Sequence, residues 1–81
     1  MRIDILLFGP QAKLAQTDRV TVDLQTSPTV AEALSVIGKT MPELAPTLAV
    51  SRLAVNHEYA SDEDVLSEED EVALIGMVSG G

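Results

Sequence analysis

The sequence has 81 residues, of which 46% are hydrophobic and 22% are charged, and it contains no cysteine. This composition is typical of one small globular domain rather than of a disordered chain. The lack of cysteine excludes disulfides, zinc–thiolate sites and cysteine nucleophiles. The opening stretch "MRIDILLFG" is short and carries charge, unlike a signal peptide or a membrane span, so a cytoplasmic protein is expected.

The formal net charge of −8 is unevenly distributed. Residues 1–52 are formally neutral, whereas residues 53–81 hold eight acidic side chains and no lysine or arginine. Such a surface repels nucleic acid and anionic membranes and attracts a basic protein partner. The acidic runs "SDED" and "SEEDE" also fit ordinary solvated turns, so both interpretations stay open.

The first half of the chain predicts two strands and one helix. Residues 2–8 predict a strand that Gly9-Pro10 ends, and residues 11–17 predict a loop or a short helical turn. Residues 19–24, "RVTVDL", alternate in the manner of a half-buried strand. Thr29 and Glu32 have the spacing of a capping box at the start of a helix. The apolar positions that follow share one helical face: Val30, Ala33, Leu34, Ile37 and Met41.

The second half predicts a short helical turn in residues 42–49 and three further strands. Residues 52–56 form a strand, "HE" a turn, residues 59–61 a short return strand, and residues 71–75 the last strand. This order predicts an α+β fold, with one main helix packed on one face of a sheet. The first and last strands are the most apolar, which favours central positions in the sheet.

Strand alternation predicts an exposed apolar patch on the other face of the sheet. If Ile3, Ile5 and Leu7 face the helix, then Leu6 and Phe8 face away from it. By the same alternation Ala73 and Ile75 in the last strand face outward. A patch of this kind usually marks a binding surface, and the only two aromatic residues, Phe8 and Tyr59, are suitable anchors. The alternative is that a helical turn near Leu44 or Leu48 covers it.

Candidates for catalysis and metal binding are poor. His57 is the only histidine and lies in a predicted turn, where it is most simply incidental. The sequence has no nucleophile elbow, no glycine-rich phosphate loop and no His-Glu metal spacing. The acidic stretch 62–64 lacks the glycine and the spaced ligands of a calcium loop. We therefore predict no metal site and no catalysis by this chain alone.

The end of the sequence, "VSGG", offers a different kind of chemistry. Glycine has no Cβ, so Gly80-Gly81 can pass through a channel too narrow for other residues. A terminal carboxylate resists nucleophiles until it is activated, for instance as an acyl-adenylate made with ATP. Because the chain has no phosphate loop, a partner would supply that activation. A flexible end would give the same letters.

Four segments carry a resemblance to a known family: "ILLFG", "TVAEAL", "LAVN" and "DEVALI" followed by "VSGG". Together they make the sequence resemble the ubiquitin-like sulfur carriers of the MoaD/ThiS family, most closely the small-subunit branch of molybdopterin synthase. The resemblance implies a β-grasp (ubiquitin-like) fold with a mixed sheet of about five strands. It also implies two parts, a domain over residues 1–75 and an extended tail over residues 76–81.

The same resemblance implies a function for the tail. An activating enzyme of the MoeB type would use ATP to adenylate Gly81, which would then become a thiocarboxylate. Val78, Ser79 and Gly80 would thread into the large synthase subunit (MoaE type), where the sulfur forms the dithiolene of molybdopterin. The chain would be a non-catalytic sulfur donor without a bound cofactor. The implied partner-binding residues are Phe8, Tyr59, Ile75 and Met77.

One departure and several alternatives accompany this resemblance. The family commonly has two prolines where this sequence has Gly76-Met77, so insertion of the tail should carry a larger ordering cost. The nearest alternative is a carrier for thiamine, for tRNA thiolation or for cysteine synthesis. A second is a ubiquitin-like modifier joined to lysines of other proteins. The third is an interaction module that makes no use of its two glycines.

Overall fold

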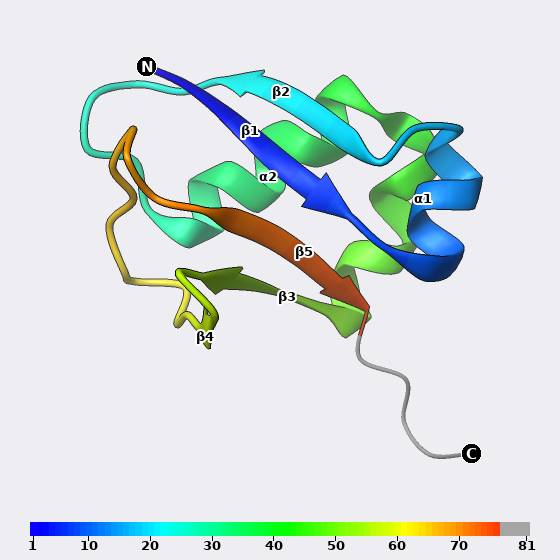
Figure 1. The fold of residues 1–81 in the computed structure, drawn as a ribbon. Helices are drawn as coiled ribbons and strands as arrows, with labels where there is room; N and C mark the ends of the chain where they lie inside the picture. The colour runs from blue at the N-terminus through cyan, green and yellow to red at the C-terminus, as the bar shows by residue number, and fades with distance from the viewer. Residues whose placement is uncertain (77–81) are drawn as a thin grey trace.

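The computed structural model describes residues 1–76 as a five-stranded sheet with helices packed against it (Figure 1). The strands are β1 (Arg2–Leu7), β2 (Arg19–Asp23), β3 (Ser51–Val55), β4 (Glu58–Tyr59) and β5 (Val72–Gly76). Their order in the sheet is β2-β1-β5-β3-β4. β1 and β5 pair in parallel and the other pairs are antiparallel. The predicted mixed sheet, with its first and last strands in the interior, is confirmed.

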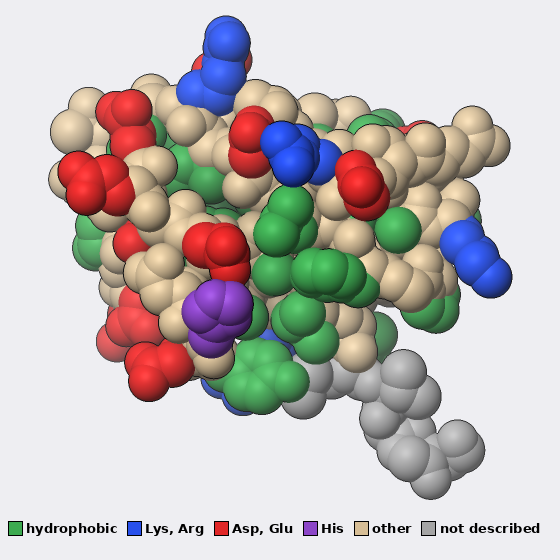
Figure 2. Space-filling view, viewed as in Figure 1, with side chains coloured by type: hydrophobic (Ala, Val, Ile, Leu, Met, Phe, Trp, Pro, Cys, Tyr) green, Lys and Arg blue, Asp and Glu red, His purple; other side chains and the backbone are tan. Residues whose placement is uncertain are grey.

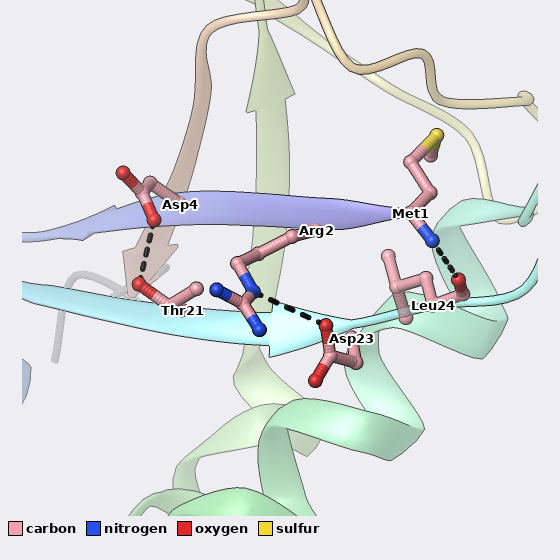
Figure 3. Close-up of polar contacts among 6 residues, drawn as sticks. All are labelled: Met1, Arg2, Asp4, Thr21, Asp23 and Leu24. Carbon is pink, nitrogen blue, oxygen red and sulfur yellow. Dashed lines mark hydrogen bonds and ion pairs between the residues drawn. The ribbon is translucent and has the colours of Figure 1, made fainter.

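β2, an edge strand of the sheet, is joined to β1 by main-chain pairing and a few polar contacts (Figure 3). The amino group of Met1 donates to the Leu24 carbonyl at 2.7 Å, and the Thr21 hydroxyl donates to Asp4 at 2.6 Å. Val20, Val22 and Leu24 are buried, which confirms the predicted alternation.

The main helix, α2 (Val30–Thr40), begins at the predicted capping box. The Thr29 hydroxyl accepts the Glu32 N–H at 3.2 Å, and the Glu32 carboxylate accepts the Thr29 N–H at 3.2 Å. These two bonds satisfy amides that would otherwise lack partners at the start of a helix. Val30, Ala33 and Ile37 are buried on the face that packs against the sheet.

A second helix, α1 (Gly9–Ala15), lies where a loop or a short helical turn was predicted. The prediction that Gly9-Pro10 ends the preceding strand is confirmed, but the same two residues also begin this helix. Gly9 has φ +53°, a value that favours glycine, and proline is well suited to the first turn.

A 3₁₀ helix, η1 (Pro42–Val50), confirms the helical segment predicted after α2. Leu44 is fully buried in the core, so η1 adds to the helical side of the sheet. The alternative in which Leu44 or Leu48 covers the opposite face is therefore wrong. After β3, the turn falls on Asn56-His57, both with positive φ. The predicted turn was one residue too late, because Glu58 already belongs to β4.

The core lies between the sheet and the helices. Its fully buried large side chains include Ile5, Leu7, Ile37, Leu44, Leu53 and Leu74. Within residues 1–76, no helix is both long and apolar enough to cross a membrane.

Candidate functional site: the open sheet face and the root of the tail

One face of the sheet is covered by no helix of residues 1–76, and we call it the open sheet face (Figures 1 and 2). It is defined by the outward side chains of Leu6, Ala54, Tyr59, Ala73 and Ile75. The strand registers pair Leu6 with Ala73, Ala73 with Ala54, and Ala54 with Tyr59. Four of these residues therefore form one apolar row across four strands, and the alternation predicted this face for Leu6 and Ala73.

Two aromatic side chains lie at the edges of the open sheet face. Phe8, directly after β1, is 54% exposed, and Tyr59 on β4 is 56% exposed. Arg52 lies opposite Ile75 in the register, and its guanidinium lies 5.4 Å from the centre of the Tyr59 ring. A cation over an aromatic ring restrains the ring without covering its outer side. The contact leaves Tyr59 available to a partner.

The open sheet face ends at a polar border on β2. Arg19 lies opposite Leu6 in the register, and its guanidinium is 3.7 Å from the Asp4 carboxylate. Asp4 also accepts the Thr21 hydroxyl. This border confines the apolar surface to β1, β5, β3 and β4.

A groove opens where β5 ends, and we call it the tail-root groove. It has a volume of about 470 Å³ and is lined by Phe8 and the start of α1, by η1 with the first residue of β3, and by β5. Its apolar lining includes Phe8, Pro10, Val50, Leu74 and Ile75. Gly76, the last residue of β5, lies at this groove, so the chain leaves the sheet beside it. Since Ile75 belongs to both surfaces and Phe8 lies at the edge of the open sheet face, the groove continues that face.

Gln11, a residue of α1, contributes a polar side chain to the lining of the tail-root groove. It is 5% exposed and is the one buried residue of residues 1–76 with a polar side chain. Its Nε2 donates to the Thr47 hydroxyl at 3.0 Å and to the Ser51 hydroxyl at 2.8 Å. The amide thereby joins α1 to η1 and to the start of β3.

The acidic loop before β5 is tied to α2 by its main chain. The carbonyls of Asp62 and Asp64 accept the Ala31 and Val30 N–H groups at 3.1 and 2.9 Å. The Asp64 carboxylate accepts the Ser61 N–H at 2.9 Å. The loop is therefore an ordered part of the fold and also carries negative charge. The attraction of a basic protein partner by this charge stays a prediction.

Asp70 and Asn56 join the β3–β4 turn to the segment before β5. The Asp70 carboxylate accepts the Ser67 N–H at 2.8 Å and the Asn56 amide at 3.0 Å. The Ser67 N–H is the main cause of a lowered pKa of Asp70, partial burial opposes it, and the Asn56 amide adds to it. Hydrogen bonds to the ionised form have this effect on a carboxyl.

His57 lies in the turn after β3 with its side chain 85% exposed, and its Nε2 is 3.1 Å from the Glu71 carboxylate. An exposed pair of this kind contributes little to stability. No group of three or more potential metal ligands occurs within the described part of the chain.

The predicted site residues fall into two groups. Phe8, Tyr59 and Ile75 lie on or beside the open sheet face, joined through Arg52 and through the groove. Of the predicted tail, Gly76 ends β5, whereas Met77, Val78, Ser79, Gly80 and Gly81 lie outside the described residues. Binding by these residues stays a prediction.

Sequence reasoning missed Gln11, Val50 and the tail-root groove. The residues that form the groove come from three segments far apart in the sequence, and an isolated glutamine in a predicted loop gives no sign of burial. The only signal was the Gly-Pro pair, which is compatible with the start of a helix as well as with the end of a strand.

Comparisons of the sequence with known proteins point to one family. A family model described as the ThiS family matches residues 5–81. A molybdopterin synthase sulfur carrier subunit of Dictyostelium discoideum is 36% identical over 95% of this chain and 93% of its own length. A protein of the same name from Chlamydomonas reinhardtii is 30% identical over the full length of both chains.

A solved structure gives the same architecture. Small archaeal modifier protein 1 of Haloferax volcanii superposes with a TM-score of 0.83 and 27% identity, covering all of both chains. The ubiquitin-like β-grasp fold is thereby confirmed. This chain belongs to the ThiS family, and its relatives within that family include proteins named molybdopterin synthase sulfur carrier subunits.

Proposed function

We propose that this chain is the sulfur carrier subunit of a molybdopterin synthase and that the carboxyl group of Gly81 carries the sulfur. The observation that carries the proposal is the family match, which runs through Gly80 and Gly81, together with relatives of that name. The fold supports it, because the last strand, β5, ends at Gly76, shortly before these two glycines in the sequence.

The chemistry begins with the carboxylate of Gly81. The carboxylate attacks the α-phosphate of ATP, pyrophosphate leaves, and an acyl-adenylate forms. Sulfide then attacks the acyl carbon, AMP leaves, and a thiocarboxylate results. The described residues include no phosphate-binding loop, so an adenylating enzyme of the MoeB type supplies the nucleotide site. We also propose a cytoplasmic location for this reaction, since it consumes ATP.

We further propose that the large synthase subunit (MoaE type) binds the open sheet face. The side chains of Phe8, Tyr59 and Ile75 are exposed or partly exposed. They lie on or beside the open sheet face, which the helices of residues 1–76 leave uncovered. Aromatic residues of this kind are common energetic centres of protein interfaces. Binding there would direct the segment after Gly76 toward the partner.

The test is the intact mass of the full chain after incubation with an activating enzyme of its host, ATP and a sulfur source. A chain without Gly81 is the control. We expect a mass increase equal to the exchange of one oxygen for one sulfur, seen only in the full chain and only with ATP. No increase, with an enzyme shown to be active on another carrier, would contradict the proposal.

A second candidate function is protein modification, favoured by the likeness to small archaeal modifier protein 1 at 27% identity. Both functions begin with an activated Gly81 and differ in its acceptor. In the same incubation, supplemented with host proteins, a modifier gives covalent adducts on lysine side chains. A carrier gives the thiocarboxylate and no adducts, so one mass-spectrometric experiment separates them.

A further inference from the structure

The main chain of β2 alternates between bonding to β1 and facing the outer edge of the sheet. The Met1 amino group donates to the Leu24 carbonyl at 2.7 Å, and the Leu24 N–H donates to the Met1 carbonyl at 2.6 Å. The Leu7 N–H donates to the Asp18 carbonyl at 2.8 Å. Hydrogen-bonded pairs recur at every second residue of an antiparallel ladder, so the even-numbered residues of β2 bond to β1. The residues whose N–H and C=O groups point away from β1 are Arg19, Thr21 and Asp23.

These outward groups form an open edge. β2 comes first in the sheet order, and within residues 1–76 no strand pairs with its outer side (Figure 1). The Thr17 hydroxyl contacts this edge at Arg19, where it accepts the N–H at 3.4 Å and donates to the carbonyl at 3.2 Å. Both distances are long for such bonds, and both contacts are exposed, so an added strand can replace them.

The two edges of the sheet differ in their protection against pairing with another strand. β4 at the opposite edge has only two residues, and one of them is Glu58. Short edge strands and repelling charges are ordinary means of preventing such pairing. β2 has five residues, all paired regularly with β1, and its exposed side chains carry both signs of charge. β2 is therefore the edge that is suited to accept a further strand.

The order of the charges on β2 is self-complementary. When a second copy of β2 lies antiparallel with Thr21 opposite Thr21, Arg19 of each copy lies opposite Asp23 of the other. All of these residues have outward main-chain groups, so each opposite pair can exchange two hydrogen bonds. Asp23 also lies 3.3 Å from Arg2 of its own chain, so the charges alternate in sign across the joined strands. The neighbouring registers with outward groups in both copies lack the Arg19–Asp23 match.

We propose that the outer edge of β2 pairs with β2 of a second copy of this chain, antiparallel and centred on Thr21, to form one continuous sheet. Opposite residues of an antiparallel pair lie on the same face, so both open sheet faces stay uncovered on one side of the joined sheet. This pairing goes beyond the proposed sulfur-carrier function and does not depend on it. Five residues from each copy are far fewer than the roughly 20–30 of a standard interface. The dimer is therefore weak, with a dissociation constant on the order of 0.1–1 mM.

The first test is the mass of the full chain in solution, measured by sedimentation equilibrium between about 0.01 and 1 mM. We expect monomers at the lower concentration and a large share of dimers at the higher one. NMR spectra over the same range locate the contact. The amide signals of Thr21 and Asp23 should shift with concentration, whereas those of Glu58 and Tyr59 at the opposite edge should not.

Charge substitutions test the register. Arg19→Asp and Asp23→Arg each place like charges opposite one another in a homodimer, so each should weaken association about tenfold. An equimolar mixture of the two variants has opposite charges at every facing pair and should associate as the wild type does. Asp23→Arg also reduces the net charge of −8, so general repulsion between chains predicts stronger association, whereas strand pairing predicts weaker association.

Both substitutions also alter exposed ion pairs within the chain, Arg19 with Asp4 and Asp23 with Arg2. Asp4→Asn is the control, because it removes one of these pairs and leaves the charges of β2 in place, so association should persist. Thermal unfolding verifies that each variant is folded. A wild-type chain that stays monomeric at about 1 mM would overturn the proposal. Concentration-dependent shifts centred on the open sheet face, or a mixture that associates no better than its two components, would overturn it as well.

Discussion

Arg52 and Tyr59 meet on the open sheet face, where the guanidinium lies 5.4 Å from the centre of the ring. Tyr59 belongs to a strand of only two residues, Glu58–Tyr59. So short a strand does little to restrain the position of the ring. The contact with Arg52 on the neighbouring strand adds this restraint. The contact thus fixes an exposed aromatic group at one end of the apolar row.

Replacing Tyr59 or Phe8 by serine should weaken binding to the large subunit about tenfold or more, since exposed aromatic anchors often contribute over 1 kcal/mol. Calorimetry with the purified large subunit measures the affinity, and thermal unfolding verifies the fold. Leu14→Gln is the matched control, because Leu14 is 46% exposed on α1. Equal weakening by all three variants would contradict an interface on the open sheet face.

Alanine should destabilise the protein at Gly9 but not at Gly38. Gly9 has φ +53° with no atom within 4 Å of an added Cβ, so Gly9→Ala should cost about 1 kcal/mol from backbone strain alone. Gly38 lies inside α2, where alanine gains about 1 kcal/mol in helix propensity. Its Cβ would meet the end of the Leu48 side chain at 3.1 Å, and Leu48 is partly exposed and can move. Gly38→Ala should therefore be neutral or slightly stabilising.

Urea unfolding measures both effects, and Gly9→Asn is the control for the first. Asparagine tolerates the left-handed region better than alanine does, so it should cost less at position 9. If Gly9→Asn destabilised the protein as much as Gly9→Ala, backbone strain would not be the cause.

The capping box should stabilise α2 measurably. Thr29→Ala removes the hydroxyl that accepts the Glu32 N–H and should lower the free energy of unfolding by about 1 kcal/mol. Thr40→Ala, at the exposed end of the same helix, should change it by less than about 0.5 kcal/mol. Urea unfolding compares the two, and a similar loss in both would show that the cap is dispensable.

The lowered pKa of Asp70 predicts a dependence of stability on pH. The folded state favours the ionised carboxylate, so its contribution is present above the unfolded pKa of about 4. The contribution is lost as the pH falls through the lower folded pKa. Asp70→Asn should therefore destabilise the protein most at neutral pH, and the difference from the wild type should shrink below about pH 4.

Urea unfolding at pH 7 and near pH 3 measures this difference. Glu63→Gln is a suitable control, because Glu63 is exposed and no side-chain hydrogen bond involves it within residues 1–76. A difference for Asp70→Asn that is independent of pH would mean that its hydrogen bonds stabilise the neutral group equally well.

The fold could be predicted where local pattern and burial agree. The alternation of β2 and the capping box at Thr29 each depend on neighbours in the sequence, and both were predicted correctly. Alternation also placed Leu6 and Ala73 on the same uncovered face, because the strand period alone decides which side a residue faces.

The tail-root groove could not be predicted, because its parts meet only through the sheet order and the packing of α1 on η1. Gln11 illustrates the difficulty. Its burial depends on Thr47 and Ser51, which lie more than 30 residues away. The start of β4 was misplaced for a different reason, since the positive φ of Asn56 and His57 is compatible with several turn positions.

The parallel pairing of β1 with β5 joins the two ends of the described chain at the centre of the sheet. During synthesis, β1 must wait for β5, and without β5 neither β1 nor β3 has its central neighbour. Contacts between such distant segments form late and cooperatively. β5 is thus the strand that completes the domain, and the open sheet face forms only once β5 is in place.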